Sequence, residues 1–137
     1  MVIGMKTVNV SKNLYGNYMK KAQECLDAAR DAAGKQNNNA AVINAIHCGI
    51  SASDALLVFF KGIRSSGQNH NETISLLRTL DFNKEEMNNK TRQLQRLLQI
   101  KNAAEYEERL MTPGDSENAV RDSERFYSWV KEKLAMV

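Results

Sequence analysis

The fold is decided by one stretch of the sequence, Ala40-Ala-Val-Ile-Asn-Ala-Ile-His-Cys-Gly-Ile-Ser-Ala-Ser-Asp-Ala-Leu-Leu-Val-Phe-Phe-Lys61. Its apolar residues would cover nearly every side of an α-helix rather than one stripe. A helix of this kind lies at the centre of a bundle or against a second subunit. Small residues such as Ala45 and Gly49 favour the close approach of a neighbouring helix, and Gly62 is a typical helix stop. We therefore expect a central helix over 40–61.

Helical patterns flank this stretch on both sides. Apolar residues recur at three-four spacing, and capping residues such as Ser11 and Asn83 precede the patterns. The predicted helices cover 11–33, 40–61, 71–80, 83–109 and from about 116 onwards. Pro113 and Gly114 predict a break over 111–115. The sequence therefore predicts an all-α fold, an up-and-down helical bundle of four long helices plus one short helix.

Length and composition indicate the domain organisation. With 137 residues, 42% hydrophobic and 26% charged, the chain is long enough for one soluble domain with a substantial core. We expect a bundle domain over 11–137 and an N-terminal tail over 1–10 that is either frayed or a short extended piece. The net charge of +3 permits nucleic acid as a partner but does not by itself argue for it.

The cellular location expected from the sequence is the cytoplasm, without a membrane segment. The longest fully apolar run, Ala55–Phe60, is too short to cross a bilayer. Residues 1–10 lack the apolar core of a signal peptide. Cys25 and Cys48 lie among apolar neighbours in helical patterns, so we interpret them as reduced core thiols.

A line of polar residues interrupts the apolar helix. Asn44, His47, Ser51 and Asp54 follow one another at spacings of three, four and three, which places them on one helical face. Buried polar groups need hydrogen-bond partners. The line therefore predicts either a structural network with a facing helix or the lining of a cleft.

The segment after this helix, Gly62-Ile-Arg-Ser-Ser-Gly-Gln-Asn-His70, reads as a loop that brings Arg64 and His70 to one corner between helices. A guanidinium is suited to phosphate oxygens, and an imidazole exchanges protons near neutral pH. This pairing indicates phosphate chemistry or phosphate binding, with Arg64 and His70 as catalytic candidates. Their neighbours Ser65, Gln68 and Asn69 are candidates to orient the phosphate. The alternative is that Arg64 is solvated and His70 only begins the next helix.

Several other chemistries are excluded by residue type and spacing. Only two histidines and two cysteines are present, without metal-ligand spacing, so we expect no metal site. The sequence has no glycine-rich phosphate loop after a strand and no nucleophile elbow. No Glu-x-x-His pair supports a di-iron bundle. We therefore expect no cofactor.

Four segments together resemble the HEPN domain, the higher eukaryotes and prokaryotes nucleotide-binding domain. They are Asn44-Ala-Ile-His-Cys-Gly-Ile-Ser-Ala-Ser-Asp-Ala-Leu-Leu through Ile63, then His70, the leucine-rich Thr73–Leu80, and Leu97-Leu-Gln-Ile-Lys-Asn-Ala-Ala-Glu-Tyr106. The similarity covers about residues 11–134. It implies a helical bundle that forms a homodimer around its second and third helices. The excess of apolar residues over 40–61 also favours a homodimer, because large exposed apolar patches are rare on monomers.

The resemblance also implies two kinds of function. Many HEPN proteins are metal-independent ribonucleases, often toxins or defence proteins, that use an arginine, four to six residues, and then a histidine. Arg64 and His70, with five residues between them, are similar to this motif. Other members bind RNA or nucleotides, or are inactive modules that partner a nucleotidyltransferase or an antitoxin.

The sequence departs from the family pattern at two points. The motif falls in a loop, whereas many active members carry it on a helix. Lys101 and Glu105 stand where many relatives of the nucleotidyltransferase-associated type have Arg and Asp, which keeps the charges.

Overall fold

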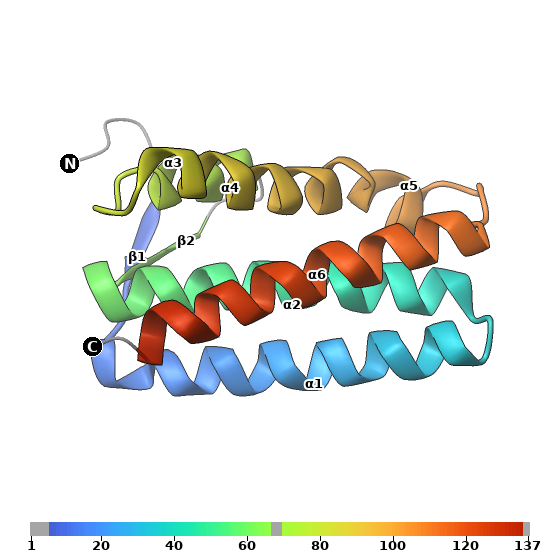
Figure 1. Ribbon diagram of the computed structural model, residues 1–137, viewed down its shortest axis with the longest axis horizontal. Coiled ribbons are helices and arrows are strands. Elements are labelled where there is room, and N and C mark those ends of the chain that lie inside the picture. Colours follow the sequence, from blue (N-terminus) through green and yellow to red (C-terminus); the bar gives the residue numbers. More distant parts are fainter. Residues whose placement is uncertain (1–5, 67–69, 136–137) are drawn as a thin grey trace.

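Four long helices lie side by side in the computed structural model, which describes residues 6–66 and 70–135 (Figure 1). Successive long helices run in opposite directions, which confirms the predicted all-α, up-and-down bundle. The long helices are α1 (Tyr15–Gly34), α2 (Asn38–Lys61), α4 (Lys84–Gln99) and α6 (Pro113–Ala135). Two short helices, α3 (Asn71–Leu77) and α5 (Lys101–Tyr106), complete the helical part of the described chain.

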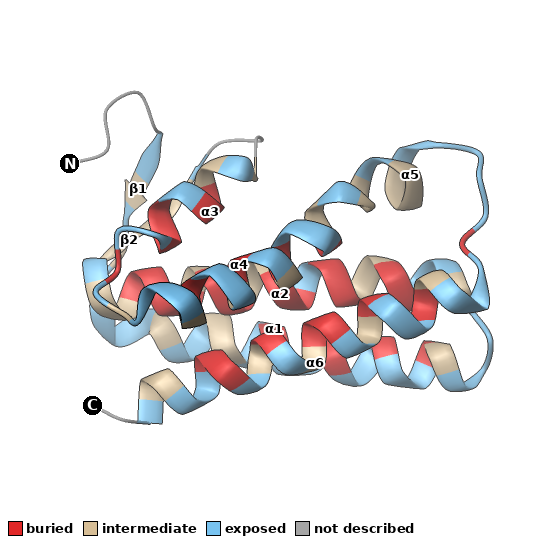
Figure 2. Cartoon of the chain, turned by 45° about the horizontal axis from the view of Figure 1, so that its top comes forward, coloured by how far each residue is buried: buried red, intermediate tan, exposed pale blue. Residues whose placement is uncertain are grey.

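Helix α2 lies at the centre of the bundle, as its apolar composition predicts. It contacts all five other α-helices and the strand β2 (Ile63–Ser65). Half of its 24 residues are buried, among them most of its aliphatic side chains (Figure 2). It is long and apolar enough to cross a membrane, but its most apolar part is mostly buried inside the bundle, as in the core helix of a soluble protein. The other elements of the chain therefore cover most of the apolar surface of α2. A second subunit is not needed to bury it.

Tight helix packing around α2 depends on its small residues. A Cβ built at Gly49 would lie 2.9 Å from a methyl carbon of Leu97 and 3.1 Å from one of Leu94. Ala45 and Ala52 are fully buried on the same helix. The helix that approaches α2 closely at Gly49 is therefore α4, which leads directly into α5.

A two-stranded antiparallel sheet closes one end of the bundle. The strand β1 (Thr7–Asn9) pairs with β2, and Val8 lies opposite Arg64. Part of the N-terminal segment is thus extended, which was one of the two alternatives. Gly62, with φ of 66°, ends α2 in the left-handed conformation and directs the chain into β2. Arg64 consequently lies on a strand and not in the loop that the sequence predicted.

The other helix ends show which capping signals were sufficient. Asn83 accepts a hydrogen bond from the backbone N–H of Glu86 at 3.0 Å, so the predicted cap of α4 is confirmed. Ser11 precedes a short 3-10 helix (Lys12–Leu14) instead of starting α1 directly. Pro113 is the first residue of α6 and not part of the break, because the first helical position needs no backbone N–H.

The predicted helix over 83–109 is interrupted at Ile100 and ends at Tyr106. Ile100, Ala103 and Ala104 pack against the buried cluster that contains Leu97 and Met111. Tertiary packing therefore overrides the continuous helical pattern. The change of direction brings α5 against α2.

Candidate functional site

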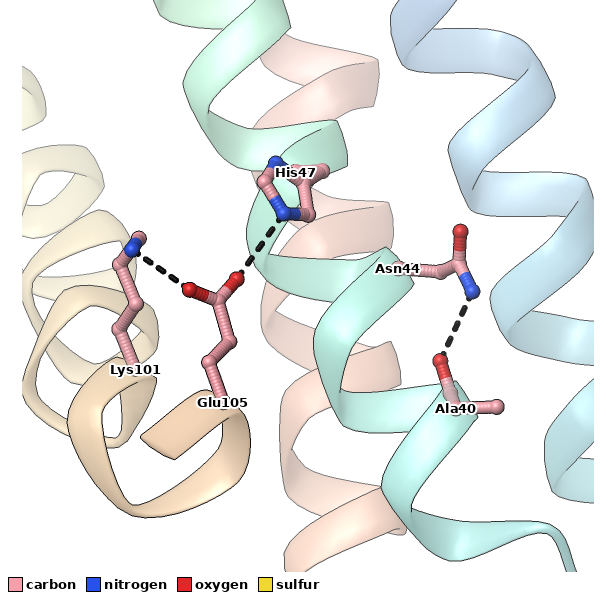
Figure 3. Close-up of polar contacts among 5 residues, drawn as sticks. All are labelled: Ala40, Asn44, His47, Lys101 and Glu105. Atoms are coloured by element: carbon pink, nitrogen blue, oxygen red, sulfur yellow. Dashed lines mark hydrogen bonds and ion pairs between the residues drawn. The ribbon is translucent and has the colours of Figure 1, made fainter. Parts of the chain in front are cut away.

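An ion-paired cluster joins the middle of α2 to α5. The Nε2 atom of His47 lies 3.0 Å from Oε1 of Glu105, and the Nζ atom of Lys101 donates to Oε2 of the same carboxylate at 2.6 Å. Figure 3 shows Glu105 between His47 and Lys101. The side chain of His47 is 47% exposed, whereas those of Lys101 and Glu105 are 17% and 13% exposed. The cluster therefore consists of a shielded ion pair and an accessible imidazole.

The protonation states in this cluster follow from its contacts. Burial opposes ionisation of Glu105, but the hydrogen bond and charge of Lys101, together with His47, outweigh it and lower the pKa of this carboxyl. The hydrogen bond to Glu105 raises the pKa of Lys101. Both groups are thus charged at neutral pH, and Glu105 can only accept hydrogen bonds.

His70 lies close to the same cluster. It is the N-cap residue of α3 and is half-buried, but its side chain makes no capping hydrogen bond. Burial lowers the pKa of His70, and the positive charge of Lys101 lowers it further. Glu105 opposes this shift, and His47 adds to it, so both are close enough to affect the ring. The structure therefore brings together His70 from the predicted motif and His47 from the polar line of α2.

Arg64 has different surroundings. Its Nη1 atom donates to the backbone carbonyl of Ser65 at 3.1 Å. Its charge lowers the pKa of Asp54, as does that of Lys21, although burial dominates and raises this pKa to about 7. The Ser65 hydroxyl oxygen is buried, and the described part of the chain supplies no hydrogen-bond partner for it. Gln68 and Asn69, the other predicted substrate-binding residues, lie outside the described residues.

The polar line of α2 is divided between these two regions. His47 faces α5, Asp54 lies near Arg64, and Asn44 donates to the carbonyl of Ala40 in its own helix at 2.9 Å (Figure 3). Ser51 is part-buried between them. Among the residues described, no hydrogen bond joins two of the four. The line is therefore not a self-contained network, and the exposure of His47 contradicts the enclosed environment that we expected for it.

Lys101, Glu105 and Tyr106 were not recognised as site residues from the sequence. Lys101 and Glu105 were noted only as charged positions at which the sequence departs from the family pattern. The available signal was the opposite charge of Lys101 and Glu105 at i,i+4 within the segment that resembles the HEPN domain. Tyr106 extends this region, because its ring is 75% exposed and lies 5.2 Å from Nζ of Lys101. Over residues 6–66 and 70–135, no group of three His, Cys, Asp or Glu side chains could hold a metal ion.

A comparison against protein families agrees with the fold. Residues 15–133 match the HEPN domain. The match covers most of the chain, so this protein belongs to the HEPN domain family. The family supports a nucleotide-binding or ribonuclease-type domain in general. A comparison with curated proteins found no match.

Proposed function

We propose that this HEPN domain is a metal-independent endoribonuclease of a cytoplasmic toxin or defence system, with His70 as the general base. The observation that carries the proposal is that His70 lies half-buried at the start of α3, within electrostatic range of Lys101, Glu105 and His47. Its lowered pKa keeps the imidazole neutral at pH 7 and able to accept a proton. The reaction needs neither a nucleophile from the protein nor a metal ion, because the 2′-hydroxyl of the substrate is the nucleophile.

In this reaction, His70 removes the proton from a ribose 2′-hydroxyl. The 2′ oxygen forms a bond to the adjacent phosphorus, and the bond from phosphorus to the 5′ oxygen breaks. The products are a 2′,3′-cyclic phosphate and a free 5′-hydroxyl. General-base assistance of this type contributes about 10²–10⁴ in rate.

Arg64 and the groups around it would hold the phosphate. A guanidinium has five N–H donors, and the contact of Nη1 with the Ser65 carbonyl uses one of them. Ser65 and, outside the described residues, Gln68 and Asn69 are the candidates to orient the phosphate. Charge stabilisation by one such donor is worth about 10²–10³ in rate.

Tyr106 offers a surface for the nucleobase. Single-stranded RNA is bound largely by stacking of its bases on aromatic side chains. The exposure of this ring and its closeness to Lys101 place an aromatic face beside a cation. We expect Tyr106→Ala to weaken RNA binding.

A test of the proposal uses the purified protein and single-stranded RNA oligonucleotides of varied sequence, with EDTA present. We expect cleavage that survives EDTA and leaves 2′,3′-cyclic phosphate ends. His70→Ala should lower the rate by about 10²–10⁴. Arg78→Ala is the matched control, because Arg78 is exposed at the other end of α3. Wild-type protein that leaves every RNA intact, or a fully active His70→Ala variant, would contradict the proposal.

A homodimer is part of this proposal, although the apolar composition of α2 no longer requires one. The chain covers most of α2 itself, so dimerisation rests on the family and on the part-exposed residues of α2 such as Ile43 and Ile50. Light scattering over a range of concentrations measures the mass directly. A mass of one chain at every concentration would exclude the dimer.

The second candidate function is a catalytically inactive module that binds a nucleotidyltransferase or an antitoxin. It is favoured by the large hydrophobic side chains of Tyr106 and Leu110, which are 75% and 73% exposed near the end of α5. Exposed aromatic and aliphatic side chains of this size are typical interface anchors. Co-purification with the product of a neighbouring gene tests this function. Tyr106→Ser with Leu110→Ser should abolish the complex without loss of folding.

A further inference from the structure

His47 is a second histidine at the site, and nothing in the Arg64–His70 motif includes it. It comes from α2, and among the described residues its ring is bonded to Glu105 of α5. The carboxylate is itself held by Lys101 at 2.6 Å, so its position does not depend on His47 alone. A mobile surface side chain would not be oriented in this way. The arrangement fixes the plane of an imidazole that remains 47% exposed.

The hydrogen bond also decides which nitrogen of His47 is available. Glu105 is ionised and can only accept, so Nε2 of His47 carries the hydrogen of this bond. The second ring nitrogen, Nδ1, is the one that can exchange a proton with a substrate. Which nitrogen exchanges protons is commonly set in this way by the bond that the other makes.

Cleavage by the 2′-hydroxyl requires two proton transfers on opposite sides of the phosphorus. The attacking 2′ oxygen loses a proton, and the leaving 5′ oxygen gains one. A single imidazole cannot contact both oxygens when attack and departure are in line. The site holds two histidines in different environments. His70 is half-buried, and burial and Lys101 lower its pKa, whereas His47 is exposed and bound to a carboxylate.

We infer that His47 donates the proton to the leaving 5′ oxygen through Nδ1, while Glu105 and Lys101 position its ring. This inference rests on the proposed ribonuclease function and adds a residue to it. The charged or titratable groups around His47 are Glu105 and Lys101 from α5 and His70 from the start of α3. The step starts with His70 neutral and His47 as the imidazolium, whose Nε2 hydrogen is bound by Glu105 and whose Nδ1 hydrogen passes to the 5′ oxygen. It ends with His70 protonated and His47 neutral, so protons and charge balance.

The test compares two substrates that differ in their leaving groups. One is a short RNA oligonucleotide, whose 5′ oxygen needs a proton to leave. The other is uridine 3′-(4-nitrophenyl phosphate), whose 4-nitrophenolate leaves without one. We expect His47→Ala to lower the rate on RNA by about 10²–10⁴ and to change the rate on the nitrophenyl ester by less than about threefold. His70→Ala should lower the rate on both, because the base is needed for either.

A second variant separates proton donation from positioning. His47→Gln keeps an N–H donor for Glu105, but an amide cannot act as a general acid at neutral pH. It should be as slow on RNA as His47→Ala. Recovery of activity in His47→Gln would overturn the inference. So would equal slowing of both substrates, or no slowing of either, in His47→Ala of unchanged fold by circular dichroism. Wild-type protein that cleaves neither substrate would instead contradict the ribonuclease function itself.

Discussion

Arg64 and His70 are five residues apart along the chain, yet the structure surrounds them with different groups. Arg64 lies on β2, bonded to the Ser65 carbonyl and near Asp54. His70 begins α3 and lies near the cluster of Lys101, Glu105 and His47. The comparison shows that neighbours in the sequence motif acquire their chemical properties from helices elsewhere in the chain. The region of Arg64 favours phosphate binding, and the region of His70 favours proton transfer.

A first prediction separates these two regions by their pH dependence. Arg64→Ala should lower RNA cleavage by about 10²–10³ at every pH, because a guanidinium stays charged throughout. Wild-type activity should fall tenfold per pH unit below the pKa of His70, which lies below 6.5, because only neutral imidazole acts as the base. The measurement is the rate of cleavage between pH 4.5 and 8. An Arg64→Ala variant within threefold of wild type would remove Arg64 from the proposed phosphate-binding site.

The second effect concerns Asp54 in the Arg64 region. Burial raises the pKa of Asp54 from 3.8 to about 7, so the folded state binds more protons than the unfolded state between these values. Stability should therefore decrease as pH rises through this window. Asp54→Asn should raise the free energy of unfolding by about 2–4 kcal/mol at pH 8, and by little at pH 4. Urea denaturation at both values measures the difference.

The matched control for Asp54 is Asp31→Asn. The side chain of Asp31 is exposed and pairs only with the exposed Lys35 at 3.6 Å, so its replacement should change stability by less than about 0.5 kcal/mol. Equal responses of the two variants would show that Asp54 is not buried in solution.

The third effect tests the ion pair in the His70 region. Glu105→Ala removes the partner of Lys101 and of His47, and Lys101 is too shielded for water to replace this contact fully. We expect a loss of about 1–3 kcal/mol in the free energy of unfolding. Glu107→Ala, an exposed change two residues away, should cost less than about 0.5 kcal/mol. Thermal denaturation of both variants gives the comparison, and similar values would indicate that the cluster does not stabilise α5.

The smallest expected effect is that of His47→Ala on stability. The side chain is half exposed, so its contact with Glu105 should contribute no more than about 1 kcal/mol. This is less than the loss expected for a buried histidine in a structural network. Chemical denaturation provides the measurement. A loss above about 2 kcal/mol would make His47 a structural residue and weaken its assignment as a proton donor.

Much of the fold was predictable because it depends on local and periodic signals. The apolar residues on nearly every side of α2 indicated a central helix. Gly62 indicated where this helix ends, and Asn83 indicated where α4 begins. The β1–β2 pair was not predictable, because its strands are short and separated by two helices. The break at Ile100 was also missed, since it results from packing against Leu97 and Met111 and not from a breaking residue.

The helical bundle and the HEPN family could be recognised from the sequence alone, which also indicated Arg64 and His70 as candidates for the chemistry. Periodicity and capping act between residues a few positions apart, so they can be read without a structure. The folded chain is needed to show which groups affect one another: Lys101 and Glu105 shift the pKa of His70, and Arg64 shifts that of Asp54. These effects depend on where α5 turns after Ile100 and how β2 pairs with β1. Burial and electrostatic interactions depend on which residues are close in space, and such residues can be far apart along the chain.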